Sequence, residues 1–211
     1  LVFGVYYADK HTAVKKLSYM TKQIIIGVLF GCVSAFASSF GVEWFKEEIL
    51  PRLQENIPVI SVTKGLMNME DGSLLTYLDL WQAKLDQLGK HIPLNAIGGP
   101  CTSYELVAHD QTEVTFCGGD PAVLHLLKEA MQTEYYHIST TTDITGIESA
   151  VALKNGYALG IALTIGLNQK KFGNDVLHFN SQAAVFGQAT KEMYRLLEYQ
   201  NALSLNNLCV G

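Results

Sequence analysis

The sequence predicts an α/β domain built on a parallel sheet, followed by an all-helical domain. Short apolar, β-branched runs alternate with helical patterns through the first two-thirds of the 211 residues, and this alternation is typical of α/β sheets. The last third has helical periodicity and no strand signal. The composition, 48% hydrophobic and 17% charged, is that of a globular chain with a sizeable core.

The predicted strands are continuous apolar runs, as expected of strands buried on both faces of a parallel sheet. They span residues 24–28, 59–62, 94–97, 114–117 and 136–139. Between them we expect helices at 42–53, 73–88 and 120–132. Gly89 would end the second helix, and Asp120 would cap the third, with Pro121 in its first turn. Ligands of such sheets bind at the carboxyl ends of the strands.

Helical spacing returns at residues 145–168 and 179–200. We therefore place a domain boundary near residues 142–146, which separates a sheet domain (1–143) from a helical domain (144–211). The first residue is Leu1 and the last stretch is a short polar tail, so we expect the chain to be a fragment.

Charge and cysteine usage exclude several classes of protein. The formal net charge is -5 and no stripe of Lys or Arg is present, so we expect no nucleic-acid partner. The four cysteines lack Cys-x-x-Cys spacing and the six histidines are dispersed. This pattern argues against a metal site or a disulfide framework and favours the cytoplasm.

Residues 23–42 carry no charge and match the length of a membrane-spanning helix. Gly27, Gly31 and Gly41, together with several small polar side chains, lower the hydrophobicity and the helix propensity of this segment. We therefore expect no membrane insertion, and carbonate extraction would test this alternative.

The most informative residue is Lys154. It is the only charged side chain between Glu148 and Lys170, in a helix that is apolar on nearly every face. Such a helix is expected to be buried, and burial lowers the pKa of a lysine toward the range useful for acid/base catalysis. The alternative is a lysine whose apolar stem lies along the helix while its amino group reaches water. The sequence favours the functional interpretation.

Two further segments follow predicted strands. Thr63-Lys64-Gly65 comes after residues 59–62, where α/β folds place ligand contacts, although a solvated turn lysine is the simpler interpretation of this segment alone. Gly98-Gly99-Pro100 follows residues 94–97 and leads into the polar run 101–105. The small residues there would let the backbone approach a ligand.

Taken together and in this order, the segments resemble the NAD(P)-dependent glycerol-3-phosphate dehydrogenase family. The resemblance rests on Thr-Lys64-Gly-Leu, on Gly99-Pro-x-x-Ser103-x-Glu, and on Asp143-x-x-Gly-x-Glu-x5-Lys154-Asn155. It covers about residues 24–201. It implies a partial Rossmann-like sheet, NAD or NADP as cofactor, dihydroxyacetone phosphate and glycerol 3-phosphate as substrate and product, and a homodimer as one possible assembly.

The resemblance also implies roles for individual residues. Lys154 would donate a proton to the C2 carbonyl oxygen, and Lys64 would contact both cofactor and substrate and stabilise negative charge on oxygen. Gly99, Cys101 and Asn155 fall on substrate-contact positions. Ser103 falls on a cofactor-contact position. Cys101 replaces the usual hydroxyl residue, and Ser103 replaces the usual Ala.

The sequence departs from the family pattern in three places. The Gly-x-Gly-x-x-Gly turn that holds the pyrophosphate is absent from the sequence. Residues 29–37 resemble an insertion in a loop. The downstream Gly-Asp-Leu and Ser-Arg-Asn elements have no counterpart, and the nearest match is Asn206-Asn207-Leu208. We therefore expect the isolated chain to have little or no activity.

Two alternatives stay open beside the membrane reading. One is a related 3-hydroxy acid or 6-phosphogluconate type of dehydrogenase, which also places a Lys-Asn pair on an interdomain helix. The other is a non-catalytic helical interaction module or degenerate remnant.

Overall fold

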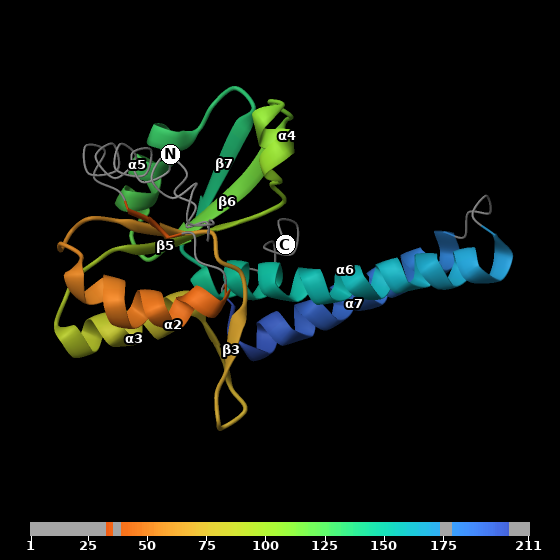
Figure 1. Ribbon diagram of the computed structural model, residues 1–211, viewed down its shortest axis with the longest axis horizontal. Coiled ribbons are helices and arrows are strands. Elements are labelled where there is room, and N and C mark those ends of the chain that lie inside the picture. Colours follow the sequence, from red (N-terminus) through yellow and green to blue (C-terminus); the bar gives the residue numbers. More distant parts are fainter. Residues whose placement is uncertain (1–32, 36–38, 174–178, 203–211) are drawn as a thin grey trace, which may run out of the picture.

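The computed structural model describes residues 33–35, 39–173 and 179–202 (Figure 1). The predicted strand at 24–28 lies outside them, as does most of the uncharged segment 23–42. The residues that align with the downstream family elements, Asn206 to Leu208, lie outside them too.

The centre of the molecule is a five-stranded sheet in the order β1-β2-β5-β6-β7. Its strands are β1 (Val33–Ala35), β2 (Val59–Ser61), β5 (Leu94–Gly98), β6 (Thr112–Gly118) and β7 (Tyr136–Thr141). The predicted α/β architecture followed by helices is confirmed. β1 lies within the segment expected to be a loop insertion, so residues 33–35 belong to the sheet, where β1 pairs with β2 in parallel.

The sheet is mixed, whereas the sequence predicted a wholly parallel one. β1, β2 and β5 are parallel to one another, and β6 is parallel to β7, but β6 runs antiparallel to β5. The connection between β5 and β6 contains only the five-residue helix α4 (Ser103–Val107). Such a helix is about 8 Å long, too short to return along the length of a strand. β6 therefore begins at the end of the sheet where β5 ends, and it runs antiparallel to β5.

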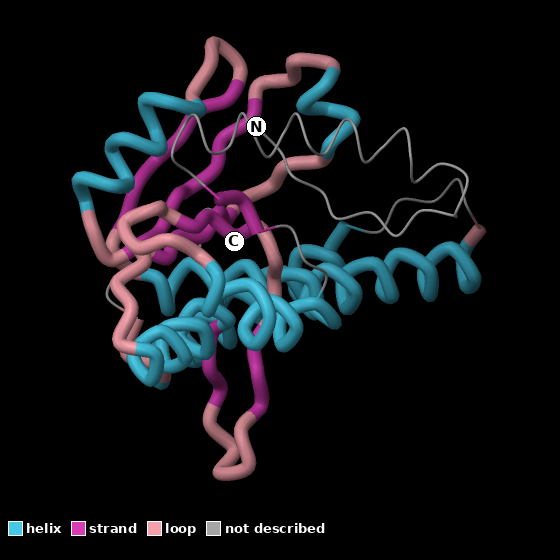
Figure 2. The backbone as a smooth tube through the Cα atoms, turned by 60° about the vertical axis from the view of Figure 1, so that its left-hand side comes forward, coloured by secondary structure: helices cyan, strands magenta, loops and turns pink. Residues whose placement is uncertain are grey.

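Helices cover both faces of the sheet (Figures 1 and 2). On one face lie α3 (Tyr77–Leu88), the start of α6 (Ile144–Phe172) and a helical stretch made of η1 (Ser39–Gly41), α2 (Val42–Trp44), η2 (Phe45–Ile49) and η3 (Leu50–Arg52). On the other face lies α5 (Pro121–Met131). The predicted caps are confirmed, because Asp120 accepts from Ala122 N and Gly89 ends α3 in the left-handed conformation.

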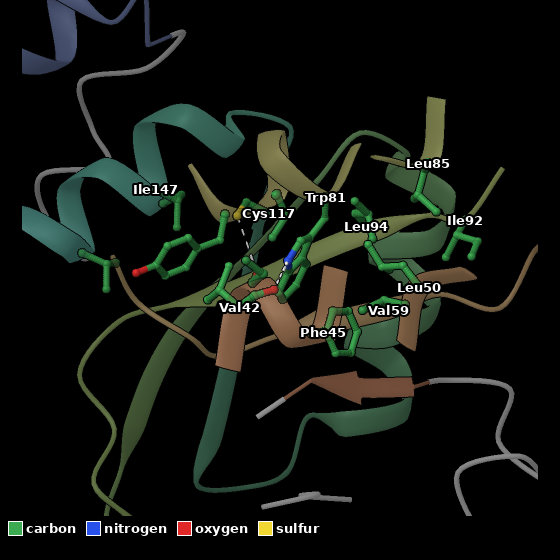
Figure 3. Close-up of a cluster of buried hydrophobic side chains, with 14 residues drawn as sticks. Val42, Phe45, Leu50, Val59, Trp81, Leu85, Ile92, Leu94, Cys117 and Ile147 are labelled. Carbon is green, nitrogen blue, oxygen red and sulfur yellow. Dashed lines mark hydrogen bonds between the residues drawn. The ribbon is translucent and has the colours of Figure 1, made fainter. Parts of the chain in front are cut away.

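Alternation along the strands supplies the two cores. Val59 faces α3, and its neighbour Ile60 faces α5. At the centre of the first core the ring of Trp81 lies 4.5 Å from that of Phe45 and is wholly buried (Figure 3). Its indole nitrogen donates to Val42 O at 3.2 Å. The helical stretch before β2 is thereby fixed to α3.

The predicted start of α3 was wrong. The sequence predicted a helix from residue 73, but residues 74–76 form β4 (Leu74–Thr76), which pairs with β3 (Leu66–Asn68) in an antiparallel hairpin. The turn of this hairpin contains Asp71-Gly72, with Gly72 at φ 82°, a common hairpin signal. The helix begins after Thr76, whose side chain forms a capping box with Asp79.

Helices α6 and α7 (Phe179–Tyr199) form a long hairpin that extends away from the sheet (Figure 1). Residues 146–151 of α6 are buried against the sheet, but most residues after Lys154 are exposed. The prediction that this helix is buried on all sides is therefore wrong for its second half, because among the described residues only α7 packs against it. Within the described residues, α6 is the one helix whose length and mean hydropathy, 1.4 over its most apolar window, would suffice to cross a membrane.

Candidate active site

Lys64 is placed by the turn that follows β2. Thr63 N donates to Ser61 Oγ at 3.2 Å, which holds the turn at the carboxyl end of the strand. Lys64 as a whole is exposed, but its Nζ donates a hydrogen bond to Gly99 O at 3.3 Å. Two predicted site residues, 35 positions apart in sequence, are thus in direct contact.

Gly99 lies immediately after β5, with φ 124°. A Cβ at this position would lie 3.0 Å from Val114 Cα and 3.1 Å from Glu113 O, so the backbone of β6 leaves no room for a side chain. A glycine is required both by the positive φ and by this close approach. The sequence analysis expected a glycine here so that the backbone could approach a ligand. The structure adds a second reason, the close packing against β6.

A cleft of about 570 Å³ opens beside this contact. Cys101 and Ser103 lie at the entrance to α4, and both are exposed and line the cleft with Lys64 and Gly99. The remaining lining residues come from the sheet, α4, and the segment from α5 to β7: Val62, Ile97, Leu106, Val114, Ala130, Met131, Thr133, Tyr135 and Tyr136. Four of the six predicted site residues therefore share one cleft.

No sequence pattern pointed to the lining residues from α5 and β7. The sequence analysis expected β7 to run parallel to β5. Tyr136, at the start of β7, would then lie at the opposite end of the sheet from Gly99. Because β6 and β7 run antiparallel to β5, the start of β7 lies at the same end of the sheet as the carboxyl end of β5, with β6 between the two strands. Burial raises the pKa of Tyr136 to about 12, and the neighbouring Cys101 adds to the effect. Tyr136 therefore stays a neutral phenol in the cleft wall.

Lys154 reaches the same region from α6. It is half-buried, one residue before the exposed part of the helix begins. Desolvation lowers the pKa of Lys64, and the charge of Lys154 lowers it further, whereas Cys101 acts in the opposite direction. The two lysines are thus close enough to influence each other. Asn155 is exposed, and neither Lys154 nor Asn155 is among the residues lining the cleft.

The cleft has the chemistry of an anion site. Its lining, as described, contains one ammonium group and no carboxylate, with a second ammonium group close by. A cleft of this volume is within the usual range for small-molecule sites. No group of three or more metal-ligating side chains occurs among the described residues.

Another ionisable group, Glu148, lines a small void together with Lys64. It is 6% exposed, and burial raises its pKa to about 7, with Asp79 adding to the rise and hydrogen bonds from Thr76 and Leu78 opposing it. The sequence motif contained Glu148, but nothing in the sequence assigned it a role.

Comparison with known proteins identifies relatives of this chain. An NADP(+)-dependent glycerol-3-phosphate dehydrogenase of Archaeoglobus fulgidus is 30% identical over 161 residues, which cover 76% of this chain and 46% of that enzyme. A glycerol-3-phosphate dehydrogenase [NAD(P)+] of Myxococcus xanthus is 30% identical over 74% of this chain and 44% of that enzyme. No family model matches the sequence.

Solved structures agree on the fold. A glycerol-3-phosphate dehydrogenase of Plasmodium falciparum matches 85% of this chain and 51% of its own, with a TM-score of 0.70 and 18% identity. The enzyme of Coxiella burnetii matches 84% of this chain and 50% of its own, with a TM-score of 0.69 and 19% identity. This chain spans about half the length of the relatives it matches. In sequence the chain is thus similar to part of NAD(P)-dependent glycerol-3-phosphate dehydrogenases, and it shares the fold of that part.

Proposed function

We propose that this chain carries the two-lysine part of an NAD(P)-dependent reduction of dihydroxyacetone phosphate to sn-glycerol 3-phosphate. The observation that carries the proposal is the approach of Lys64 and Lys154, from the end of β2 and from α6, beside an otherwise uncharged cleft. Paired ammonium groups favour a dianionic phosphate ester over a neutral ligand. The names of the relatives support NAD or NADP as the cofactor, and the dispersed cysteines favour the cytoplasm as the location.

The cofactor fits only in part. The apolar walls from Ile97, Leu106 and Met131, with Ser103 at the entrance, suit the nicotinamide end. Gly99 leaves its backbone open toward the cleft. The sequence contains no Gly-x-Gly-x-x-Gly turn for the pyrophosphate. We infer that this chain by itself holds the dinucleotide weakly.

The chain's own residues would divide the work as follows. When bound, the nicotinamide would supply a hydride to C2 of the ketone. Lys154 would give a proton to the C2 oxygen, and Lys64 would hold the negative charge that develops on that oxygen. Asn155, Cys101 and Gly99 would orient the substrate.

Binding tests the proposal more directly than turnover. Glycerol 3-phosphate titrated into ¹⁵N-labelled chain should shift the amide resonances of Lys64, Gly99 and Cys101. Lys64→Met should weaken binding by about tenfold or more, since one charge-assisted contact contributes about 1.5–3 kcal/mol. Lys191→Met, an exposed position on α7, is the matched control.

Two ligands separate the proposal from the related dehydrogenases. 3-Hydroxybutyrate has no phosphate, and 6-phosphogluconate is a longer sugar acid. Tighter binding of either one than of glycerol 3-phosphate would refute the substrate class. Added NADH or NADPH with dihydroxyacetone phosphate should give little loss of reduced cofactor with the chain alone, and Lys154→Ala should abolish what there is. Robust turnover would contradict the expected low activity.

A further inference from the structure

Glu148 is a buried carboxyl group for which the proposed chemistry has no use. It lies on α6, six residues before Lys154, and is 6% exposed. Its Oε2 accepts from Leu78 N at 3.3 Å. Leu78 is the second residue of α3, so the carboxyl group satisfies a backbone N–H that no residue of α3 itself can satisfy. Glu148 therefore links α6 to the start of α3.

The start of α3 in turn fixes the turn that carries Lys64. Tyr77 is the first residue of α3 and is buried. Gly65, with φ 150°, packs against the Tyr77 ring, and a Cβ on Gly65 would collide with the Tyr77 hydroxyl. The position of Tyr77 thus determines where the Lys64–Gly65 backbone can lie.

A third contact closes the arrangement. Glu148 and Lys64 line one small void of about 10 Å³ together with Thr63, Gly65, Ala96, Ile97, Ile147 and Val151. A void of this size is at the lower limit for a single water molecule. Little free space therefore separates α6 from the Lys64 turn, and Glu148 forms part of the wall of this void.

The surroundings of Glu148 make it an unusual residue for simple packing. Apart from burial, Asp79, Thr76 and Leu78 N influence the pKa of Glu148. Glu148 in turn raises the pKa values of Tyr77 and Cys117. No lysine or arginine forms a salt bridge with it among the described residues. A buried carboxyl without a cationic partner costs stability, whereas an apolar side chain would fill the same space without this cost.

We propose that Glu148 is a positioning residue that sets the separation between Lys154 and Lys64, by holding α6 to the first turn of α3 and, through Tyr77, to the Lys64 turn. The proposal rests on the proposed function for the role of the two lysines, but its geometric content does not. Glu148 itself is not among the residues that line the cleft.

The pKa of Lys64 reports the separation, because the charge of Lys154 lowers it. Lysines labelled by ¹³C reductive methylation can be titrated by NMR, with Lys64→Met and Lys154→Met providing the assignments. Lys154→Met should raise the pKa of Lys64 by about half a unit, the size expected of one like charge in a partly solvated site. Glu148→Ala should raise it by roughly half as much or more, since α6 is then no longer held.

Glu148→Gln should leave the pKa of Lys64 at its wild-type value, because the amide oxygen still accepts from Leu78 N. Glu129→Ala, an exposed glutamate on α5, should also leave it unchanged. If Glu148→Ala does not fold, Glu148→Asp takes its place, since it retracts the carboxyl by one methylene and should also raise the pKa.

The direction of the change separates the explanations. A folded Glu148→Ala or Glu148→Asp variant with a wild-type pKa at Lys64 would show that Glu148 stabilises the fold without positioning the lysines. A fall in this pKa in Glu148→Gln would show that Glu148 acts by its charge, and would also overturn the proposal. No substrate enters these titrations, so failure of glycerol 3-phosphate to bind would refute the proposed function and leave this result standing.

Discussion

The two halves of α6 have similar apolar composition and opposite surroundings. From Gly146 to Val151 the helix is buried against the sheet, where Ile147 and Val151 join the core around Trp81. Beyond Lys154, Leu159, Leu163 and Leu167 are each about 60% exposed. An apolar helical sequence therefore indicates that the helix can be buried. Contacts with residues distant in sequence decide which part of it is buried. Lys154 lies at the border of the two halves.

The largest expected effect is in the packed half of the molecule. Trp81→Ala should destabilise the chain by about 3–5 kcal/mol, since it opens a cavity at the centre of the core and removes the indole N–H that donates to Val42 O. Chemical denaturation followed by circular dichroism measures the change. Trp44→Ala is the matched control, because Trp44 is 52% exposed. Equal losses for the two variants would contradict the assignment of the core.

The free energy of unfolding should depend on pH through Glu148, in the buried half of α6. The folded pKa of Glu148, about 7, lies above its ordinary value of 4.5. Between these values the folded state binds more protons than the unfolded state, so the stability that Glu148 contributes falls as the pH rises. The free energy of unfolding of the wild type, relative to Glu148→Gln, should decrease by roughly 2–3 kcal/mol from about pH 5 to about pH 8.

Paired denaturation curves at the two pH values measure this difference. Glu129→Gln serves as the control at an exposed position on α5. A difference between wild type and Glu148→Gln that does not vary with pH would mean that the Glu148 carboxyl is solvated in the folded state.

The smallest expected effect is in the exposed half of α6. Leu163→Ala should change the free energy of unfolding by less than about 0.5 kcal/mol, because the side chain is 59% exposed and loses little packing. Leu85→Ala, at a wholly buried leucine of α3, should cost about 2–5 kcal/mol in the same experiment. A loss at Leu163 as large as that at Leu85 would show that this face of α6 is covered in solution.

The candidate site was predicted in part. Lys64, Gly99, Cys101 and Ser103 follow two strands that the sequence identified, and the structure brings them into one cleft. Tyr136 was missed because the direction of β7 depends on the length of the β5–β6 connection, which carries no periodic signal. The void shared by Glu148 and Lys64 joins residues more than eighty positions apart, and no local pattern reports such a contact.

Most elements could be predicted from the sequence alone, in kind and in order, as could the caps at Asp120 and Gly89 and the order of the segments that resemble the dehydrogenases. These features depend on neighbours within one or two helical turns, where periodicity and side-chain chemistry act directly. Tertiary structure decided the antiparallel entry of β6, the β3–β4 hairpin, the half-burial of α6 and the approach of Lys154 to Lys64. Each of these depends on how surfaces far apart in the chain share a limited volume, which is a property of the packed molecule.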